Sequence, residues 1–257
     1  MEQEEDENAE ASSSLALVPF TYCNNFIDPL QVETRMFCFP GLDNSSITIK
    51  QKWEAGGKGG TQIGFGASVY NASYVLSYFL SNNIAMRDKC IIELGCGPGL
   101  ASIVAGHSHA KKVVATDGDK ISVDLCNENI ELNDVSNNVS ATRLLWGTGN
   151  CHHDNETLQV RTKHFGSQII DYIIASDVVA LPYEDAYGDL LYTLEELCTL
   201  GTTEIILVYQ KRHVSENAFF DEFNSKFLVK RLPRTMIPED FRSQPICIYR
   251  AVLKESI

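Results

Sequence analysis

The feature that most constrains the fold is a cluster of glycines directly after a short apolar run. The run Cys90–Leu94 has the length and composition of a buried strand, and Gly95, Gly97 and Gly99 follow it at alternate positions. Glycine lets the backbone turn tightly and approach a ligand without a clash from a Cβ atom. The pattern predicts an α/β sheet with a ligand-binding loop between a strand and a helix.

The spacing of this loop discriminates between ligands. A dinucleotide loop of the form GxGxxG needs glycine at its sixth position, where this chain has Leu100. Asp117 ends a second strand, at a separation of about 20 residues that suits an acceptor for both ribose hydroxyls. Glu93, two places before the first glycine, is expected to approach the cationic half of the ligand. The pattern favours S-adenosylmethionine, which has no phosphates, over a nicotinamide cofactor; glycines and acids that merely end strands are the alternative interpretation.

The remaining pattern alternates between helices and buried strands, as a parallel sheet requires. After Tyr70, Ala72, Val75, Leu76, Phe79 and Leu80 fall on one helical face. We expect further helices over 121–132, through 190–197 and around 219–223, and further strands over 113–115, 169–175, 204–209, 226–231 and 245–252. These elements predict an α/β, Rossmann-like domain with a nucleoside-binding loop over residues 67–257.

The N-terminal quarter has a different pattern. Residues 1–14 are acidic and then serine-rich, which predicts a disordered tail. Within an extension over 15–66, the runs 35–39 and 47–49 flank the segment Pro-Gly-Leu-Asp-Asn at 40–44 and predict a β-hairpin.

Charge and cysteine content limit the partners and the compartment. The 257 residues carry a net charge of -13, which repels nucleic acid and anionic lipid, so we expect no direct contact with either. The 8 cysteines form no CxxC pair and indicate a reducing compartment. The acidic N-terminus is unlike a targeting signal. We therefore expect a cytoplasmic protein, with the nucleus as a second compartment, and a monomer because no exposed apolar stripe is evident.

Several separated motifs carry a resemblance to a known family. They are the helix Val69–Leu76, the loop Glu93–Gly99 with Thr116-Asp117, the turn Leu145-Trp146-Gly147, the segment Ala175–Val179 and the strand ending Tyr209–Arg212. Together they resemble the seven-β-strand protein methyltransferases called methyltransferase family 16, which mostly modify lysines in proteins. The resemblance runs from about residue 64 to residue 223.

This resemblance implies a sheet in the order 3-2-1-4-5-7-6 with an antiparallel seventh strand, and methyl transfer to a lysine of a protein substrate. It implies contacts to S-adenosylmethionine from Tyr70, Glu93, Gly95, Cys96, Gly97, Asp117, Trp146 and Ser176. Asp177 would align the substrate ammonium. The chain departs from the family at Ala180, where a tyrosine is usual, and Tyr183 is the candidate substitute.

Each of these assignments has an alternative. Asp177 could cap the next helix, and Trp146 could be a core residue. Cys151-His152-His153-Asp154, with His164 nearby, has no structural zinc spacing and lies in an expected polar loop. Cys96 has no histidine placed to activate it as a nucleophile. A noncatalytic cofactor-binding interaction protein and a small-molecule methyltransferase remain the competing functions.

Overall fold

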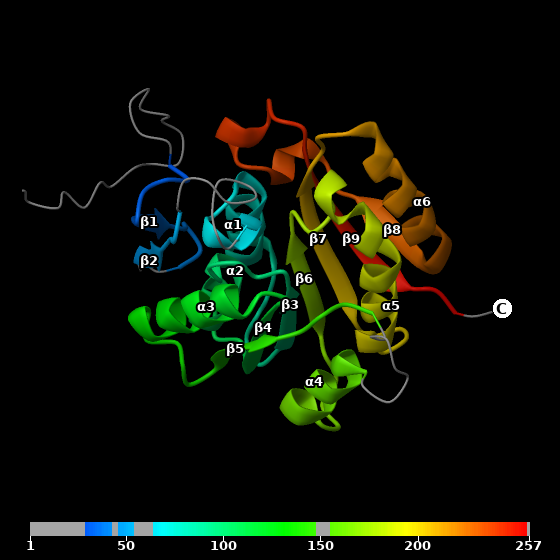
Figure 1. Cartoon of the computed structure of the whole chain (residues 1–257), viewed down its shortest axis with the longest axis horizontal. Coiled ribbons are helices and arrows are strands. Elements are labelled where there is room, and N and C mark those ends of the chain that lie inside the picture. Colours follow the sequence, from blue (N-terminus) through cyan, green and yellow to red (C-terminus); the bar gives the residue numbers. More distant parts are fainter. Residues whose placement is uncertain (1–28, 43–45, 54–63, 148–154, 256–257) are drawn as a thin grey trace, which may run out of the picture.

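The computed structural model describes residues 29–42, 46–53, 64–147 and 155–255. Seven strands form one sheet in the order β5-β4-β3-β6-β7-β9-β8 (Figure 1). They are β3 Cys90–Leu94, β4 Lys112–Asp117, β5 Val139–Arg143, β6 Tyr172–Ser176, β7 Glu204–Gln210, β8 Phe227–Arg231 and β9 Ile246–Leu253. Neighbours among β3 to β7 pair in parallel, and β9 is antiparallel to β7 and β8. Counted from β3, this confirms the order 3-2-1-4-5-7-6 with an antiparallel seventh strand.

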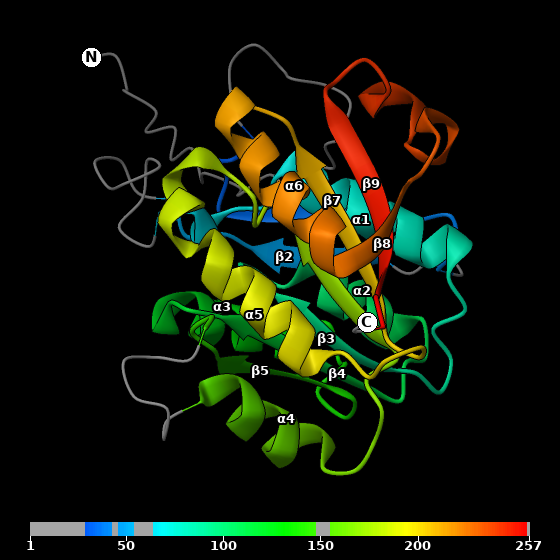
Figure 2. The same ribbon diagram turned by 90° about the vertical axis from the view of Figure 1, so that its right-hand side faces the viewer.

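Helices cover both faces of the sheet (Figures 1 and 2). One face carries α1 Asn71–Asn83, α2 Leu100–His107 and α3 Lys120–Leu132; the other carries α4 Glu156–Phe165, α5 Tyr187–Leu197 and α6 Asn217–Lys226. Successive side chains of a strand point to opposite faces, so Ile91 of β3 packs in the first core and Ile92 in the second. Covering both faces buries every residue of β3, which explains why all of its residues except Glu93 are apolar.

Short 3-10 helices connect these elements: η2 Gly64–Ala67, η3 Leu181–Ala186, η4 Val214–Glu216, η5 Arg234–Met236 and η6 Glu239–Phe241. No helix within the described ranges combines the length and the apolar character needed to cross a membrane.

The predicted N-terminal hairpin is confirmed as β1 Thr34–Cys38 paired antiparallel with β2 Ser46–Lys50. Two asparagines of α3 satisfy the backbone at the other edge of β2. The amide of Asn133 accepts from Thr48 N at 2.9 Å and donates to Thr48 O at 2.8 Å. Asn129 does the same with Lys50 at 2.8 and 3.0 Å. The helical rise of about 6 Å over the four residues from 129 to 133 nearly matches a two-residue strand step of about 6.7 Å, so the two side chains replace a neighbouring strand.

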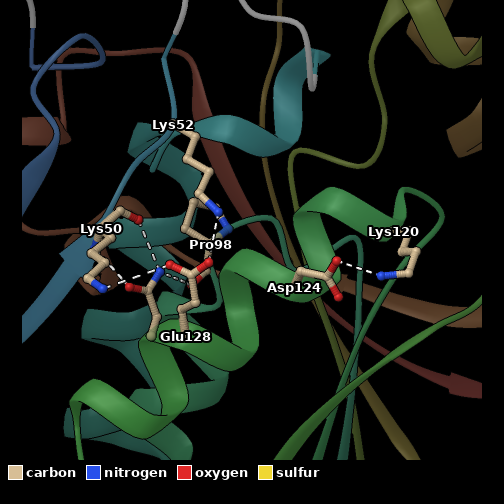
Figure 3. Close-up of polar contacts among 7 residues, drawn as sticks. Lys50, Lys52, Pro98, Lys120, Asp124 and Glu128 are labelled. Atoms are coloured by element: carbon tan, nitrogen blue, oxygen red, sulfur yellow. Dashed lines mark hydrogen bonds and ion pairs between the residues drawn. The ribbon is translucent and has the colours of Figure 1, made fainter.

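Asn129 also reaches the glycine loop. Its fully buried amide donates to Pro98 O at 2.9 Å, so one side chain joins the hairpin, α3 and the loop after β3. Beside it, the Glu128 carboxylate pairs with the ammonium groups of Lys52 at 2.8 Å and Lys50 at 3.8 Å (Figure 3). These two ion pairs are half-exposed and contribute little, whereas the Asn129 contacts are shielded from water.

Most predicted elements are confirmed within a few residues, and the face of α1 is buried as expected. The helix expected over 121–132 is confirmed as α3, in which Ile121 and Leu132 are exposed. The polar loop expected around His164 is wrong: residues 156–165 form α4, which Asn155 caps by accepting from Leu158 N. Strand β5 was not predicted. The expected disordered tail, residues 1–14, lies outside the described residues.

We predict that Asn129→Ala lowers the free energy of unfolding by about 2–3 kcal/mol, because buried partners on Lys50 and Pro98 lose their hydrogen bonds. Denaturant unfolding measures the change. Glu128→Ala, on the same helix, is the matched control and should cost less than about 1 kcal/mol. An equal loss in both variants would contradict the role given to Asn129.

Candidate active site

The turn after β3 needs glycine for steric reasons. Gly95, Gly97 and Gly99 have φ values of 65°, 49° and 89°, in the left-handed region that L side chains rarely adopt. A Cβ atom at position 95 would lie 2.7 Å from Val178 Cγ1, and one at position 99 would lie 2.4 Å from Cys126 Sγ. The backbone of this turn therefore lies unusually close to its neighbours, as the loop pattern predicted.

Asp117, the last residue of β4, lies against this turn. Its Oδ2 atom accepts a hydrogen bond from Gly97 N at 3.0 Å, and its Oδ1 atom accepts from Asp119 N at 3.0 Å. Burial raises the pKa of this carboxyl, although these backbone bonds oppose the rise. A carboxylate has about four acceptor positions, so two remain for further donors. The geometry fits a carboxylate that receives two ribose hydroxyls.

Glu93 precedes the glycine turn, and its approach to a ligand stays a prediction. It lies inside β3 with no exposed surface, and its Oε2 atom accepts from Ser102 N at 3.0 Å and Ser102 Oγ at 2.5 Å. Burial raises its pKa to about 7. This carboxyl therefore satisfies the first turn of α2. Its Oε1 atom is buried and has no hydrogen-bond partner among the described residues.

Cys96 belongs to the scaffold of the turn. Its backbone N donates to Thr116 O at 2.9 Å, which fastens the turn to β4. A hydrogen bond with Cys126, together with burial, raises the pKa of the Cys96 thiol well above its usual value. A neutral, buried thiol is a poor nucleophile, which agrees with the expectation that this residue does not act as one.

Trp146 forms a wall beside the turn. Its Cζ2 atom lies 3.8 Å from the position that a Cβ on Gly95 would take. The side chain is half-buried and packs against the core under β6 and α5. Trp146 is therefore packed against the core and also lies beside the glycine turn, and its contact with the cofactor stays a prediction.

Asp177 directly follows Ser176, the last residue of β6, and has a φ of 54°. Its backbone N donates to Val208 O at 3.0 Å, and its Oδ1 atom accepts from Gln210 N at 2.9 Å. The side chain thus extends the pairing of β6 with β7 by one step. The alternative that Asp177 caps the next helix is wrong, because Ala180 precedes η3 and no side chain caps it.

Arg212 is a partner of Asp177 that the sequence analysis did not identify. Its guanidinium donates from Nη2 to Asp177 Oδ2 at 2.7 Å and from Nη1 to Asp177 Oδ1 at 3.1 Å. Burial opposes the charge of Arg212, but Asp177, Glu216 and Tyr70 outweigh it and raise the pKa of the guanidinium. The sequence does show that Arg212 lies just past a strand, where a site residue is expected. Its pairing with Asp177, 35 residues away, depends on the tertiary fold and cannot be read from local sequence.

The other candidates are placed as follows. Tyr70 precedes α1, is half-buried and interacts electrostatically with Arg212. Ala180 is half-buried with an extended backbone. The side chain of Tyr183, in η3, lies outside the part that the structure describes, so its role stays a prediction. Cys151, His152, His153 and Asp154 also lie outside it, and the described residues contain no group of three potential metal ligands.

Comparison with known proteins gives the class. Residues 42–226 match the lysine methyltransferase family. The protein-lysine methyltransferase METTL21E of Bos taurus is 34% identical over 199 residues, which cover 74% of this chain and 61% of that protein. The protein N-lysine methyltransferase METTL21A of Danio rerio is 29% identical over 247 residues, which cover 94% of this chain and 98% of the relative.

Solved structures share the fold at low identity. A candidate SAM-dependent methyltransferase from Streptococcus mutans superposes with a TM-score of 0.54 at 16% identity, covering 86% of this chain and 56% of that one. The chain therefore belongs to the lysine methyltransferase family, whose members use S-adenosylmethionine as methyl donor, and the resemblance noted in the sequence is confirmed. The chain spans about three fifths of the length of its bovine relative.

We predict that Asp117→Ala weakens binding of S-adenosylhomocysteine about 100-fold or more, because two hydrogen bonds to a charged acceptor are lost. Calorimetric titration measures the affinity, and denaturant unfolding checks the fold. Asp124→Ala, which removes an exposed carboxylate of α3, should bind as the unchanged protein does. Undiminished affinity in the Asp117 variant would refute the ribose assignment.

Proposed function

We propose that this chain transfers methyl groups from S-adenosylmethionine to the ε-amine of a lysine in a protein substrate. The observation that carries the proposal is the placement of two groups at the same edge of the sheet. The Asp117–Gly97 contact lies at the carboxyl ends of β4 and β3, and the Asp177–Arg212 pair lies at the carboxyl ends of β6 and β7. Ligands of open α/β sheets bind at the carboxyl ends of the strands.

In this proposal the glycine turn and its neighbours bind the cofactor. Asp117 accepts the ribose hydroxyls, the backbone of Gly95, Cys96 and Gly97 follows the ligand closely, and Trp146 borders the adenine. Tyr70 and Ser176 complete the site from α1 and β6. When bound, the cofactor supplies a methyl group on a cationic sulfonium, and the chain orients the amine for in-line attack and excludes water.

The substrate lysine must be neutral to attack. With a reference pKa near 10.4, removing its proton at pH 7 costs about 4–5 kcal/mol. An unpaired carboxylate next to the amine would stabilise the ammonium and raise that cost. The Asp177 carboxylate accepts two hydrogen bonds from the Arg212 guanidinium and one from Gln210 N. The guanidinium also neutralises the charge of the carboxylate. Asp177 can then align the amine through a remaining lone pair without strongly favouring the protonated form.

Ala180 supports a second candidate function. The family usually has tyrosine here, and the described residues place no aromatic side chain at this position. A noncatalytic protein that binds the cofactor and a partner would retain the Asp117 site and tolerate this change. A small-molecule methyltransferase is a third candidate. Observed methyl transfer to a protein would distinguish the main proposal from both of these alternatives.

We also propose a reducing compartment, the cytoplasm with the nucleus as alternative, and a monomer without direct nucleic-acid or membrane contact. The six cysteines within the described ranges are free, and five of them are buried. Free thiols are typical of reducing compartments.

The proposed function is tested with S-adenosylmethionine carrying a labelled methyl group, incubated with cell extract and the purified chain. We expect discrete labelled protein bands whose label maps to lysine, and none with Asp117→Ala. Cofactor binding without any labelled protein would favour the noncatalytic function. Label only in the small-molecule fraction would favour the third candidate.

We predict that Arg212→Met moves the pH at which kcat/KM is half-maximal upward by about one unit, because an unpaired Asp177 stabilises the lysine ammonium. The measurement is a pH–rate profile on an acceptor found in the extract. Lys89→Met breaks an ion pair with Asp171 at the opposite edge of the sheet and serves as control. A uniform loss of rate without a shift in the profile would mean that Arg212 is only structural.

A further inference from the structure

A second concave site lies at the same edge of the sheet, beyond β7. It is a pocket of about 260 Å³ between β7, β8, β9 and α6. Three cationic side chains and three aromatic rings define it, and we call it the basic-aromatic pocket: Lys211, Arg231, Arg234, Tyr209, Phe220 and Tyr249. None of these residues takes part in the cofactor site described above.

The topology places this pocket next to the Asp177–Arg212 pair. Lys211 directly follows β7, and Arg231 is the last residue of β8. Both strands are antiparallel to β9, so they run in the same direction and end at the same edge. Lys211 is flanked in the chain by Gln210 and Arg212, which both contact Asp177. A protein segment with its lysine at Asp177 would therefore extend over the pocket.

The aromatic rings form the floor of the pocket. The ring centroids of Tyr209 and Phe220 lie 4.8 Å apart, and those of Phe220 and Tyr249 lie 4.9 Å apart. Burial raises the pKa of Tyr249 to about 12, so its hydroxyl is neutral at physiological pH. A packed, neutral floor lowers the local dielectric and strengthens the field of the cations above it.

The three cations have no acidic partner in the part of the chain that the structure describes. Within the described ranges, no carboxylate lies within 4.0 Å of the charged atoms of Lys211, Arg231 or Arg234. The Lys211 ammonium donates only to Asn217 Oδ1 at 3.0 Å, and the Arg234 guanidinium is held by the carbonyls of Arg242 and Gln244. All three side chains are exposed. Unpaired cations gathered in one pocket are notable in a chain with a net charge of -13.

We infer that the basic-aromatic pocket binds an acidic side chain of the protein substrate, close in sequence to the lysine that is methylated. Lys211 supplies a point charge, and the fork of Arg231 suits a carboxylate. The net negative charge of the chain disfavours a long polyanion such as nucleic acid, but a short acidic segment contacts only the local positive field. The inference rests on the proposed function, since it assigns substrate selection to the same edge.

The test uses two fluorescent peptides, each with a central lysine, flanked in one by glutamates and in the other by glutamines. Fluorescence anisotropy measures their binding to the full chain saturated with S-adenosylhomocysteine. We expect the glutamate peptide to bind more tightly, and Lys211→Glu and Arg231→Glu each to weaken it about fivefold or more. Arg234 is left unchanged because its guanidinium also joins two backbone segments.

Lys230→Glu is the matched control, because it makes the same change of charge as Lys211→Glu beside Arg231, on the other face of β8. It should weaken binding less than about twofold, since it acts only through the screened overall charge. Calorimetry should show unchanged affinity of all variants for S-adenosylhomocysteine. Equal binding of the two peptides, or an equal loss in Lys230→Glu, would overturn the inference. In a parallel reaction with S-adenosylmethionine as methyl donor, selective binding of the glutamate peptide without its methylation would contradict the proposed function, while the binding role of the pocket would stand.

Discussion

The backbone turn after β3 has its shape because three neighbours hold it, and the site is built around that turn. In β4, Asp117 accepts a hydrogen bond from Gly97 N, and Thr116 O accepts one from Cys96 N. In α3, the Asn129 amide donates to Pro98 O. Left-handed backbone at three nearby glycines is costly to order without such contacts. Since Asn129 also pairs with β2, the N-terminal hairpin is part of the support of the turn and is not a separate appendage.

This arrangement explains why so much of the fold could be predicted from sequence. The central strands are buried on both faces, so β3 and β7 are predominantly apolar and local pattern identifies them. Strand β5 lies at the edge of the sheet, and only its first residue is buried, so it has no such pattern. Helix α4 buries three residues in an otherwise polar sequence, which is typical of a loop as well as of a marginal helix.

The site was predictable to a smaller extent, for a physical reason. The position of Asp117 beside the glycine turn could be predicted, because its place at the end of a strand and its distance from the glycines follow from the topology. The role of Glu93 could not, because burial and the bond to Ser102 depend on how α2 packs. The same holds for Arg212, which meets Asp177 only when β6 and β7 lie side by side. Pairing of charges is decided by tertiary contacts that local sequence does not encode.

The most direct measurement is a crystal structure of the chain with S-adenosylhomocysteine and a lysine peptide. The account predicts that both ribose hydroxyls donate to Asp117, that the adenine lies beside Trp146, and that the lysine side chain points toward the sulfur past Asp177, which keeps its pair with Arg212. A ribose bound away from Asp117, or a peptide lysine that enters from another edge of the sheet, would contradict it.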